Sequence, residues 1–442
     1  MHREKLPPNW KWVKVEYVTF PVKKVQPKNN PEKPFVYIDI SSIDNNIQKI
    51  TDPKEYIGKD APSRARQLIE KNDVLFSTVR TYLMNIAYVP DIYDGQIAST
   101  GFSVLRSKDI VDPKFLYYYC LTKEFLEPLN SLQRGTSYPA VRDGDVRAQP
   151  FPLAPLVEQR LIVSKIEELF SQLDAGVAGL KRAQAALKRY RGSVLKAAFE
   201  GRLVPQDPND EPVNLSLKKL GKKSVEIESL PKLPKNWSYA KLSDVAEVNK
   251  RDSIIKELPP NMNVSFVPMA AVDEHLGEII YPEIRNLKDV WKGYTYFREG
   301  DVLFAKITPC MENGKAAIAK NLENGIGFGS TEFHVFKTNE LIMNKYLYYF
   351  IRQKRFRSEA KANFTGTAGH MRVPTNFVKK YKIPLPPINE QRRIIQRIES
   401  DLTILEGIQN TINTNLQRSE RVRQSILKKA FEGKLLPRNL DI

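Results

Sequence analysis

The chain has 442 residues, 41% hydrophobic and 27% charged, which is the composition of an ordinary soluble protein with about three domains and excludes a mostly disordered chain. Lysine and arginine number 69 against 51 acidic residues, so the net charge of +18 predicts a polyanionic partner, with nucleic acid ahead of an anionic membrane. No apolar run approaches the roughly 18 residues of a membrane-spanning helix, and the first residues lack the apolar segment of a signal peptide. Only two cysteines, Cys120 and Cys310, and four histidines occur, which favours a reducing cytoplasm and argues against a disulfide framework or a metal site.

Residues 1–150 predict a globule of mixed α/β class. Short β-branched or alternating runs are separated by proline, aspartate, asparagine and glycine, as strands between turns are. We expect strands at Trp12–Tyr17, Phe35–Ile40, Val74–Val79, Ile86–Val89 and Ser103–Leu105, and a helix over 113–127.

Residues 151–205 predict a long helix, or arm. Apolar residues recur at alternating steps of four and three, which is typical of a helix in a coiled coil, although such a stripe can also be a helix in a globular core. Gly201 and Pro205 follow it as stop signals. Roughly 44 helical residues would make a rod of about 66 Å. The predicted seam residues on this arm are Ile162, Ile166, Leu169, Leu173, Leu180 and Leu187.

A charged, proline-containing linker is expected at 206–232, and a second globule at 233–382. This globule is also expected to be mixed α/β. Its predicted strands lie near 264–268, 301–307, 315–319 and 333–337, with a helix near 344–357.

Residues 383–437 repeat the first arm. They align with 151–205 without a gap and share 21 identities in 55 positions, where average composition predicts roughly 3. The predicted seam of this second arm is Ile394, Ile398, Leu405, Ile408 and Ile412. Because the first arm leads from globule one to globule two and the second leaves globule two, arms that pair must run antiparallel. The expected molecule is a dumbbell with an approximate two-fold axis.

The motifs of the arms resemble one known family. Pro-Leu-Ala-Pro-Leu-Val-Glu-Gln-Arg opens the first arm at 152–160 and Pro-Leu-Pro-Pro-Ile-Asn-Glu-Gln-Arg opens the second at 384–392. They close on Lys-Ala-Ala-Phe-Glu-Gly and Lys-Lys-Ala-Phe-Glu-Gly, and a Gly-Thr pair precedes each arm. This pattern, present twice, is similar to the specificity subunit of type I DNA restriction–modification systems. The segment 301–315 also resembles a stretch of that family's target-recognition domains.

The resemblance implies that the two globules are target-recognition domains, each binding half of a split, asymmetric site on double-stranded DNA. The helical arms would act as spacers and docking platforms. The implied partners are two adenine methyltransferase subunits and ATP-driven restriction, or translocase, subunits. S-adenosylmethionine, ATP and Mg²⁺ are then expected on those partners and no cofactor on this chain.

The sequence carries no motif that would make the chain a catalyst. The phosphate loop Gly-x4-Gly-Lys-Ser/Thr is absent. The one glycine-rich candidate for a methyl-donor site, Gly325–Ser330, is better interpreted as a turn between strands. We therefore predict a non-enzymatic subunit. The alternatives are a basic coiled-coil scaffold without sequence-specific DNA recognition and the recognition part of a fused DNA methyltransferase.

Candidate DNA-contacting residues are polar, basic or aromatic residues in predicted loops of the globules, because phosphate contacts supply affinity and base-edge contacts supply specificity. In the first globule they are Thr78, Arg80, Tyr82, Arg134, Thr136, Ser137, Tyr138 and Arg142. In the second they are Lys306, Thr308, Asn313, Lys315, Thr365, Thr367, His370 and Arg372. For each single residue the plain alternative is a solvated surface charge or a structural turn.

Overall fold

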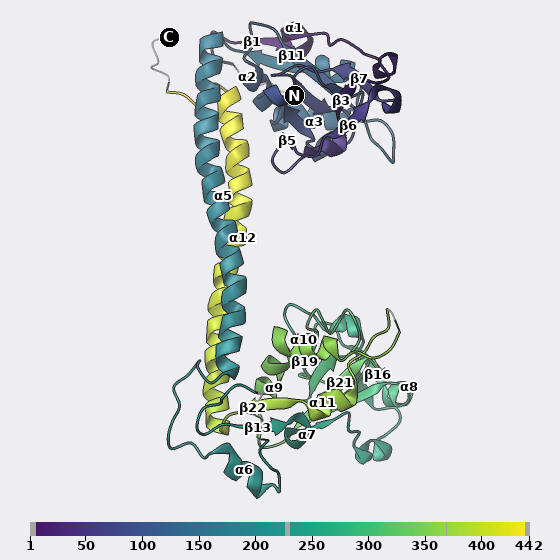
Figure 1. Cartoon of the computed structure of the whole chain (residues 1–442), viewed down its shortest axis with the longest axis vertical. Coiled ribbons are helices and arrows are strands. Elements are labelled where there is room, and N and C mark those ends of the chain that lie inside the picture. The colour runs from purple at the N-terminus through teal and green to yellow at the C-terminus, as the bar shows by residue number, and fades with distance from the viewer. Residues whose placement is uncertain (1–5, 226–229, 368, 438–442) are drawn as a thin grey trace. The chain divides into compact units, whose positions relative to one another are not determined.

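The computed structural model describes residues 6–225, 230–367 and 369–437. The chain forms two compact units (Figure 1): unit 1 is Met1–Lys181 with Asn413–Ile442, and unit 2 is Arg182–Ile412. Each unit contains one α/β globule, part of helix α5 (Leu156–Phe199) and part of helix α12 (Ile388–Phe431). The mixed α/β class with two long helices is confirmed. The sequence predicts domain boundaries at 150, 205, 232 and 382, which place each long helix in a single segment. These boundaries stay predictions.

The globule of unit 1 is built on two four-stranded sheets. The first has the order β2 (Thr19–Phe20), β11 (Phe102–Ser107), β8 (Val74–Ser77), β9 (Ile86–Tyr88). The second has the order β6 (Lys54–Ile57), β3 (Pro34–Ile38), β10 (Ile97–Ser99), β7 (Ala65–Leu68), with β3 and β10 parallel. Two smaller antiparallel pairs are β1 (Lys11–Lys14) with β12 (Pro150–Leu153) and β4 (Ile43–Asp44) with β5 (Lys49–Ile50).

The globule of unit 2 repeats this plan. One sheet has the order β14 (Ala246–Val248), β21 (Phe333–Thr338), β18 (Val302–Ala305), β19 (Ala316–Ile318). The other has the order β16 (Glu283–Asn286), β15 (Asn263–Val267), β20 (Ile326–Gly329), β17 (Thr295–Arg298), with β15 and β20 parallel. The pair β13 (Ser238–Lys241) with β22 (Lys382–Leu385) corresponds to β1 with β12.

Short helices differ from the sequence predictions at three places. The predicted strand Trp12–Tyr17 ends at Lys14, because the helical turn α1 (Val15–Val18) buries both of its valines. The predicted helix 113–127 is two helices, α2 (Pro113–Cys120) and α3 (Lys123–Ser131), because the Thr122 hydroxyl caps α3 by accepting from the Phe125 N–H (3.3 Å). The predicted helix 344–357 is likewise divided into α9 (Asn344–Ile351) and α10 (Lys354–Ala362). The remaining short helices are α4 (Asp143–Arg147), α6 (Val213–Lys219), α7 (Leu242–Val245), α8 (Leu287–Val290) and α11 (Thr375–Lys380).

The predicted glycine-rich turn at Gly325–Ser330 is also corrected, since Ile326–Gly329 forms strand β20. Its glycines make room for an aromatic ring. A Cβ added to Gly327 would lie 2.1 Å from the Phe297 ring. The segment is therefore a closely packed strand. It is neither a turn nor a loop that could bind the phosphate of a cofactor.

A buried glutamine fastens each long helix to its globule. The Gln159 side chain accepts from the Asp112 N–H (2.9 Å) and donates to the carbonyls of Ile110 (3.1 Å) and Ala154 (2.7 Å). In unit 2, Gln391 accepts from the Met343 N–H (2.8 Å) and donates to the carbonyls of Leu341 and Pro386 (2.8 and 3.0 Å). The repeated Glu-Gln-Arg motif is therefore a structural anchor, which we call the glutamine anchor.

The end of the opposite long helix completes each core. Phe431 at the end of α12 packs on Phe115 in unit 1, with 4.8 Å between ring centroids. Phe199 at the end of α5 packs on Tyr346 in unit 2, at 4.9 Å. Since each unit holds the start of one long helix beside the end of the other, the two helices run antiparallel within each unit.

Most predicted seam residues are buried or half-buried between the helices and globules. Ile162, Ile166, Ile394, Ile398, Leu405 and Ile412 are buried, and Leu169, Leu173, Leu180 and Leu187 are half-buried. The prediction for Ile408 is wrong, because this residue is 44% exposed. Leu405 and Ile412, the pattern positions on either side of Ile408, are buried, so the departure is confined to this one position.

Candidate nucleic-acid interface

In unit 1, two of the predicted DNA-contacting segments meet, although about 55 residues separate them. We call Thr78–Met84 the β8 loop and Arg134–Ala140 the first Gly-Thr hairpin. The hairpin is closed by mutual backbone hydrogen bonds between Arg134 and Ala140 (2.9 and 3.0 Å). The Arg80 N–H donates to the Pro139 carbonyl (2.7 Å) and the Val141 N–H to the Thr78 carbonyl (2.9 Å). The loop and the hairpin are therefore one backbone assembly.

Unit 2 holds the corresponding segments in the same way. We call Lys306–Lys315 the β18 loop and Thr365–Arg372 the second Gly-Thr hairpin. Thr365 and Arg372 exchange backbone hydrogen bonds (3.0 and 2.9 Å). The Thr308 N–H donates to the Met371 carbonyl (3.0 Å), and the Val373 N–H to the Lys306 carbonyl (2.9 Å). The same frame thus presents the predicted residues in both units.

The exposed side chains of the first assembly are mainly aromatic and hydroxyl groups. Tyr138 is 72% exposed, and Tyr82, Thr136 and Ser137 are also exposed. Arg80 lies over the Tyr138 ring, with 4.9 Å from Cζ to the centroid, and its Nη2 donates to the Ser137 carbonyl (3.0 Å). Hydroxyl groups, a tyrosine face and a guanidinium can contact both phosphates and bases.

Three predicted residues of unit 1 have structural partners. Thr78 is only 8% exposed and its hydroxyl donates to the Gly101 carbonyl (2.9 Å), so the prediction that it contacts DNA is wrong. A strand end that turns back under the hairpin buries this side chain. Arg134 lies 3.5 Å from Asp145, and the Arg142 N–H donates to the same carboxylate (2.9 Å) at the start of α4. Both arginine residues remain exposed.

Side chains also hold the β18 loop. The Thr308 hydroxyl donates to Glu312, and Lys315 Nζ donates to the Met269 carbonyl (3.2 Å). Asn313 is exposed and its amide donates to Glu274 (3.0 Å). These contacts set the loop's shape while leaving the Asn313 face open to solvent.

In the second Gly-Thr hairpin, Arg372 is held by a carboxylate. Its Nε and Nη2 both lie 2.8 Å from the Glu332 carboxylate oxygens, and Nη1 donates to the His370 carbonyl (2.8 Å). This pairing raises the pKa of Arg372 and lowers that of Glu332. Thr365, Thr367 and His370 remain exposed. Arg372 therefore shapes the hairpin, and its charge is largely neutralised.

The sequence analysis missed two arginines that support loops of unit 2, Arg357 under the β18 loop and Arg352 under residues 274–275. Arg357 on α10 donates to the Glu312 carbonyl, and a Cβ on Gly314 would lie 3.2 Å from its Nη1. Burial lowers the pKa of Arg357. Arg352 donates to the Glu274 carbonyl (2.9 Å). In the sequence, these arginines are visible only as basic residues of a predicted helix. That pattern does not show whether a basic side chain supports a loop or is solvated at the surface.

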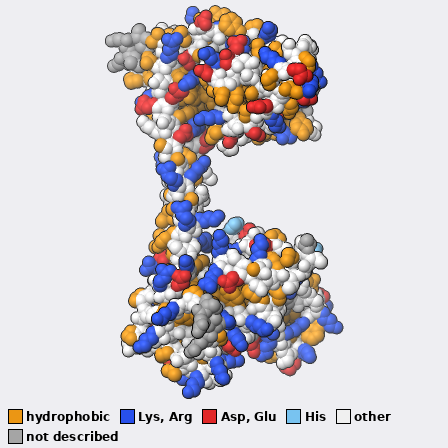
Figure 2. Space-filling model, viewed as in Figure 1, with side chains coloured by type: hydrophobic (Ala, Val, Ile, Leu, Met, Phe, Trp, Pro, Cys, Tyr) orange, Lys and Arg blue, Asp and Glu red, His pale blue; other side chains and the backbone are white. Residues whose placement is uncertain are grey.

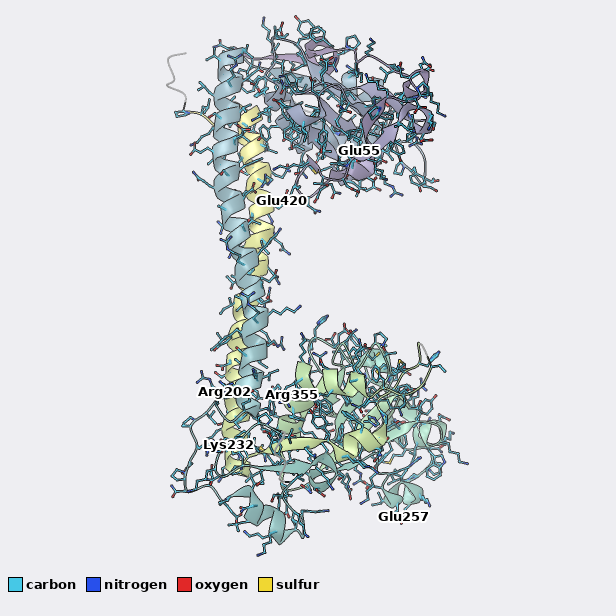
Figure 3. The ribbon with its side chains drawn as sticks, in the orientation of Figure 1. Glu55, Arg202, Lys232, Glu257, Arg355 and Glu420 are labelled. Carbon is cyan, nitrogen blue, oxygen red and sulfur yellow. The ribbon has the colours of Figure 1, made fainter. Side chains whose placement is uncertain are left out.

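Basic side chains also gather beyond the hairpins in unit 2. Between Arg182 and Phe199, α5 carries five basic residues and no acidic one, and lysines and arginines are prominent on the helix surface in Figure 2. A cavity of about 1290 Å³ lies beside this segment and is lined by Arg202, Lys232 and Arg355, which Figure 3 shows near one another. Thr365 of the second Gly-Thr hairpin lines the same cavity. Glu200 and Glu359 also line the cavity, where they pair with Arg202 and Arg355, so its lining carries charges of both signs.

The described part of the chain lacks two other classes of feature. Within residues 6–225, 230–367 and 369–437, no group of three or more histidine, cysteine, aspartate and glutamate side chains could hold a metal ion. No helix in those same ranges is both long and apolar enough to cross a membrane.

Comparisons with known proteins define the family. The model of the type I restriction modification DNA specificity domain matches residues 14–179 and 234–418. The chain belongs to this family. Neither a scaffold without sequence-specific recognition nor a fused methyltransferase is favoured.

A curated relative and two solved structures illustrate the similarity. The chain is 34% identical over 294 residues to the type I restriction enzyme EcoAI specificity subunit of Escherichia coli, and the match covers 61% of this chain and 49% of that protein. The chain thus spans about half the length of that relative. The HsdS subunit from Thermoanaerobacter tengcongensis is 30% identical with a TM-score of 0.63, covering 98% of this chain and 99% of that one. A chain from a structure on complex assembly and conformational transition of the type I R-M system is 29% identical, with a TM-score of 0.72 and coverage of 98% and 100%.

Proposed function

We propose that this chain gives a type I restriction–modification complex its DNA specificity by binding a split, non-palindromic target, with one half-site on each unit. One observation carries the proposal. The two units hold a Gly-Thr hairpin and an adjoining loop in the same backbone frame, but they expose different side chains. Unit 1 offers Tyr82 and Tyr138, whereas unit 2 offers Asn313 and His370. Because the two units present different exposed side chains on the same backbone frame, we expect them to bind two different half-sites.

The partners are part of the same proposal. We expect two adenine methyltransferase subunits, because the glutamine anchor and the long-helix start occur twice and offer two similar docking faces. Restriction, or translocase, subunits would join for cleavage. S-adenosylmethionine, ATP and Mg²⁺ would be bound by those subunits, the arms 151–205 and 383–437 would act as spacers, and the complex would work in the cytoplasm.

The proposal is tested by exchanging the first globule. Residues 1–150 are replaced by the first globule of another family member, and the chain is combined with its methyltransferase subunits. Sequencing of methylated DNA should show a change in one half-site only, because the second globule is untouched. A change in both half-sites, or methylation without sequence preference by the unmodified complex, would contradict the proposal.

A further inference from the structure

A third loop adjoins the other two in each unit. In unit 1 it is Asp44–Lys49, between the paired residues Ile43 and Ile50. In unit 2 it is Asp273–Glu278, between the bridged residues Val272 and Ile279. We call these segments the tip loops.

The two tip loops have the same internal construction. Asp44 Oδ1 accepts from the Asn46 N–H (2.8 Å), and Asp273 Oδ1 accepts from the His275 N–H (2.8 Å). The fifth residue of each loop has a positive φ, 50° at Gln48 and 69° at Gly277. Such a conformation is uncommon outside glycine. The backbones therefore turn at the same position.

Each tip loop is fastened from below by a tyrosine of the helix under it. The Tyr117 hydroxyl on α2 donates to the Gln48 carbonyl (3.3 Å), and the Tyr348 hydroxyl on α9 donates to the Gly277 carbonyl (3.1 Å). A loop held at its turn by a side chain from the core presents its tip in a defined position, as a specific recognition surface requires.

Each tip loop is also joined to the neighbouring candidate loop. In unit 1 the Asn45 amide donates to the Leu83 carbonyl of the β8 loop (3.0 Å). In unit 2 the Asn313 amide of the β18 loop donates to Glu274 (3.0 Å). The tip loop, the β8 or β18 loop and the Gly-Thr hairpin are thus connected through hydrogen bonds in both units.

The tip of each loop exposes a large aliphatic side chain beside a polar one. Ile47 is 52% exposed and follows Asn46, and Leu276 is 64% exposed and follows His275. A single exposed aliphatic residue is ordinary on a protein surface. Here it recurs at the equivalent position of two fastened loops, next to groups that hydrogen-bond base edges. In the major groove, aliphatic groups contact the thymine methyl, and asparagine pairs with adenine.

We propose that the tip loops contact base edges, with Ile47 and Leu276 against thymine methyl groups and Asn46 and His275 bonded to adjacent bases. This inference rests on the proposed function and adds a specificity determinant to each half-site. Within the described residues, the first loop would act on the half-site of unit 1 and the second on that of unit 2.

The test combines an Ile47→Ala variant with DNA in which single thymines are replaced by deoxyuridine, which lacks the methyl group. Binding is measured for the complex with its methyltransferase subunits. One replacement in the first half-site should weaken wild-type binding about five- to tenfold, because the protein loses contact with one covered methyl group. The variant should bind the normal target equally weakly, and the same replacement should then have no further effect. Leu276→Ala should behave in this way in the second half-site.

Ile92→Ala is the matched control, since Ile92 is also an exposed isoleucine of unit 1 but lies outside the three loops. It should leave the response to deoxyuridine unchanged, and all variants should keep the wild-type unfolding temperature. If the wild-type complex binds DNA sequence-selectively but the Ile47→Ala variant still responds to deoxyuridine, this inference is overturned and the proposed function is not. Loss of methyltransferase subunits from the variant, with unchanged DNA preference, would overturn it in favour of a protein contact. A wild-type complex without sequence preference would overturn the proposed function and the inference together.

Discussion

The two units share the contacts that join each globule to the long helices, and they expose different side chains on their loops. Gln159 and Gln391 make the same three kinds of buried hydrogen bond, and Phe431 and Phe199 close the two cores in the same manner. On the loops, Arg80 stacks on an exposed tyrosine, whereas Arg372 is paired with Glu332. Backbone hydrogen bonds define the frame in both units, so the exposed side chains can differ without changing it.

Two equivalent buried aspartates have different ionic partners in the two units. Asp73 and Asp301 occupy the same turn before the central strand of their sheets, and each accepts a backbone N–H at 2.8 Å. Arg106 holds Asp73 through two contacts of 2.9 Å. At the position corresponding to Arg106, Lys337 pairs instead with Asp252 (3.3 Å). Burial consequently raises the pKa of Asp301 to about 6.

The largest expected effect tests the equivalence of the glutamine anchors. Gln159→Leu and Gln391→Leu should each destabilise their own unit by about 3–6 kcal/mol, because three buried backbone groups lose their partners. Hydrogen exchange resolved along the chain reports each unit separately. Gln172→Leu is the control, since Gln172 lies on the exposed face of the same helix. Clearly unequal losses would show that the two anchors are not energetically equivalent.

Replacing the equivalent aspartates Asp73 and Asp301 by asparagine should change the free energy of unfolding of their units in opposite directions. Asp73→Asn should cost unit 1 about 2 kcal/mol at pH 7.5, because it removes the buried carboxylate and leaves Arg106 with the half-exposed Glu70 alone (2.7 Å). Asp301→Asn should stabilise unit 2 by about 2 kcal/mol at that pH, because it removes a carboxylate that burial disfavours when ionised.

The pH dependence of unit 2 follows from the raised pKa of Asp301. An unfolded aspartate loses its proton near pH 4, whereas the folded one keeps it up to about pH 6. The contribution of this group to stability therefore falls as pH rises from about 4 to 6 and is constant above that. Asp301→Asn should remove this decline, as measured by hydrogen exchange between pH 4 and 7.5. A variant with the wild-type pH profile would exclude Asp301 as its source.

The smallest expected effect concerns the charges of Arg80 in the β8 loop and of Arg372 in the second Gly-Thr hairpin. Within the described residues, no carboxylate forms an ion pair with Arg80, while Arg372 is neutralised by Glu332. If Arg80 contacts a phosphate, Arg80→Ala should reduce the slope of log affinity against log salt by about 0.9. Arg372→Ala should change that slope much less, and Glu332→Gln should steepen it by freeing the guanidinium. Equal slope changes for both arginine variants would remove the proposed electrostatic difference between Arg80 and Arg372.

The repeat, the family resemblance and the two long helices could be predicted from the sequence alone. Both helices have the predicted 44 residues, because a heptad pattern between proline and glycine signals depends only on neighbours along the chain. The sequence also identified the Gly-Thr segments and the loops that follow β8 and β18, because turn residues after apolar runs are local signals. Whether the individual side chains in these loops contact DNA stays a prediction.

Tertiary structure decided which side chains are available. Thr78 is buried against Gly101, Arg372 is taken by Glu332, and Gln159 is an anchor instead of a surface residue of the helix. The tip loop of unit 1 was missed because Asp44-Asn45-Asn46 has the composition of any turn. Each of these outcomes depends on contacts between residues that lie 20 to 50 or more positions apart. Such contacts exist only once the sheets and helices have packed, so no local pattern along the chain encodes them.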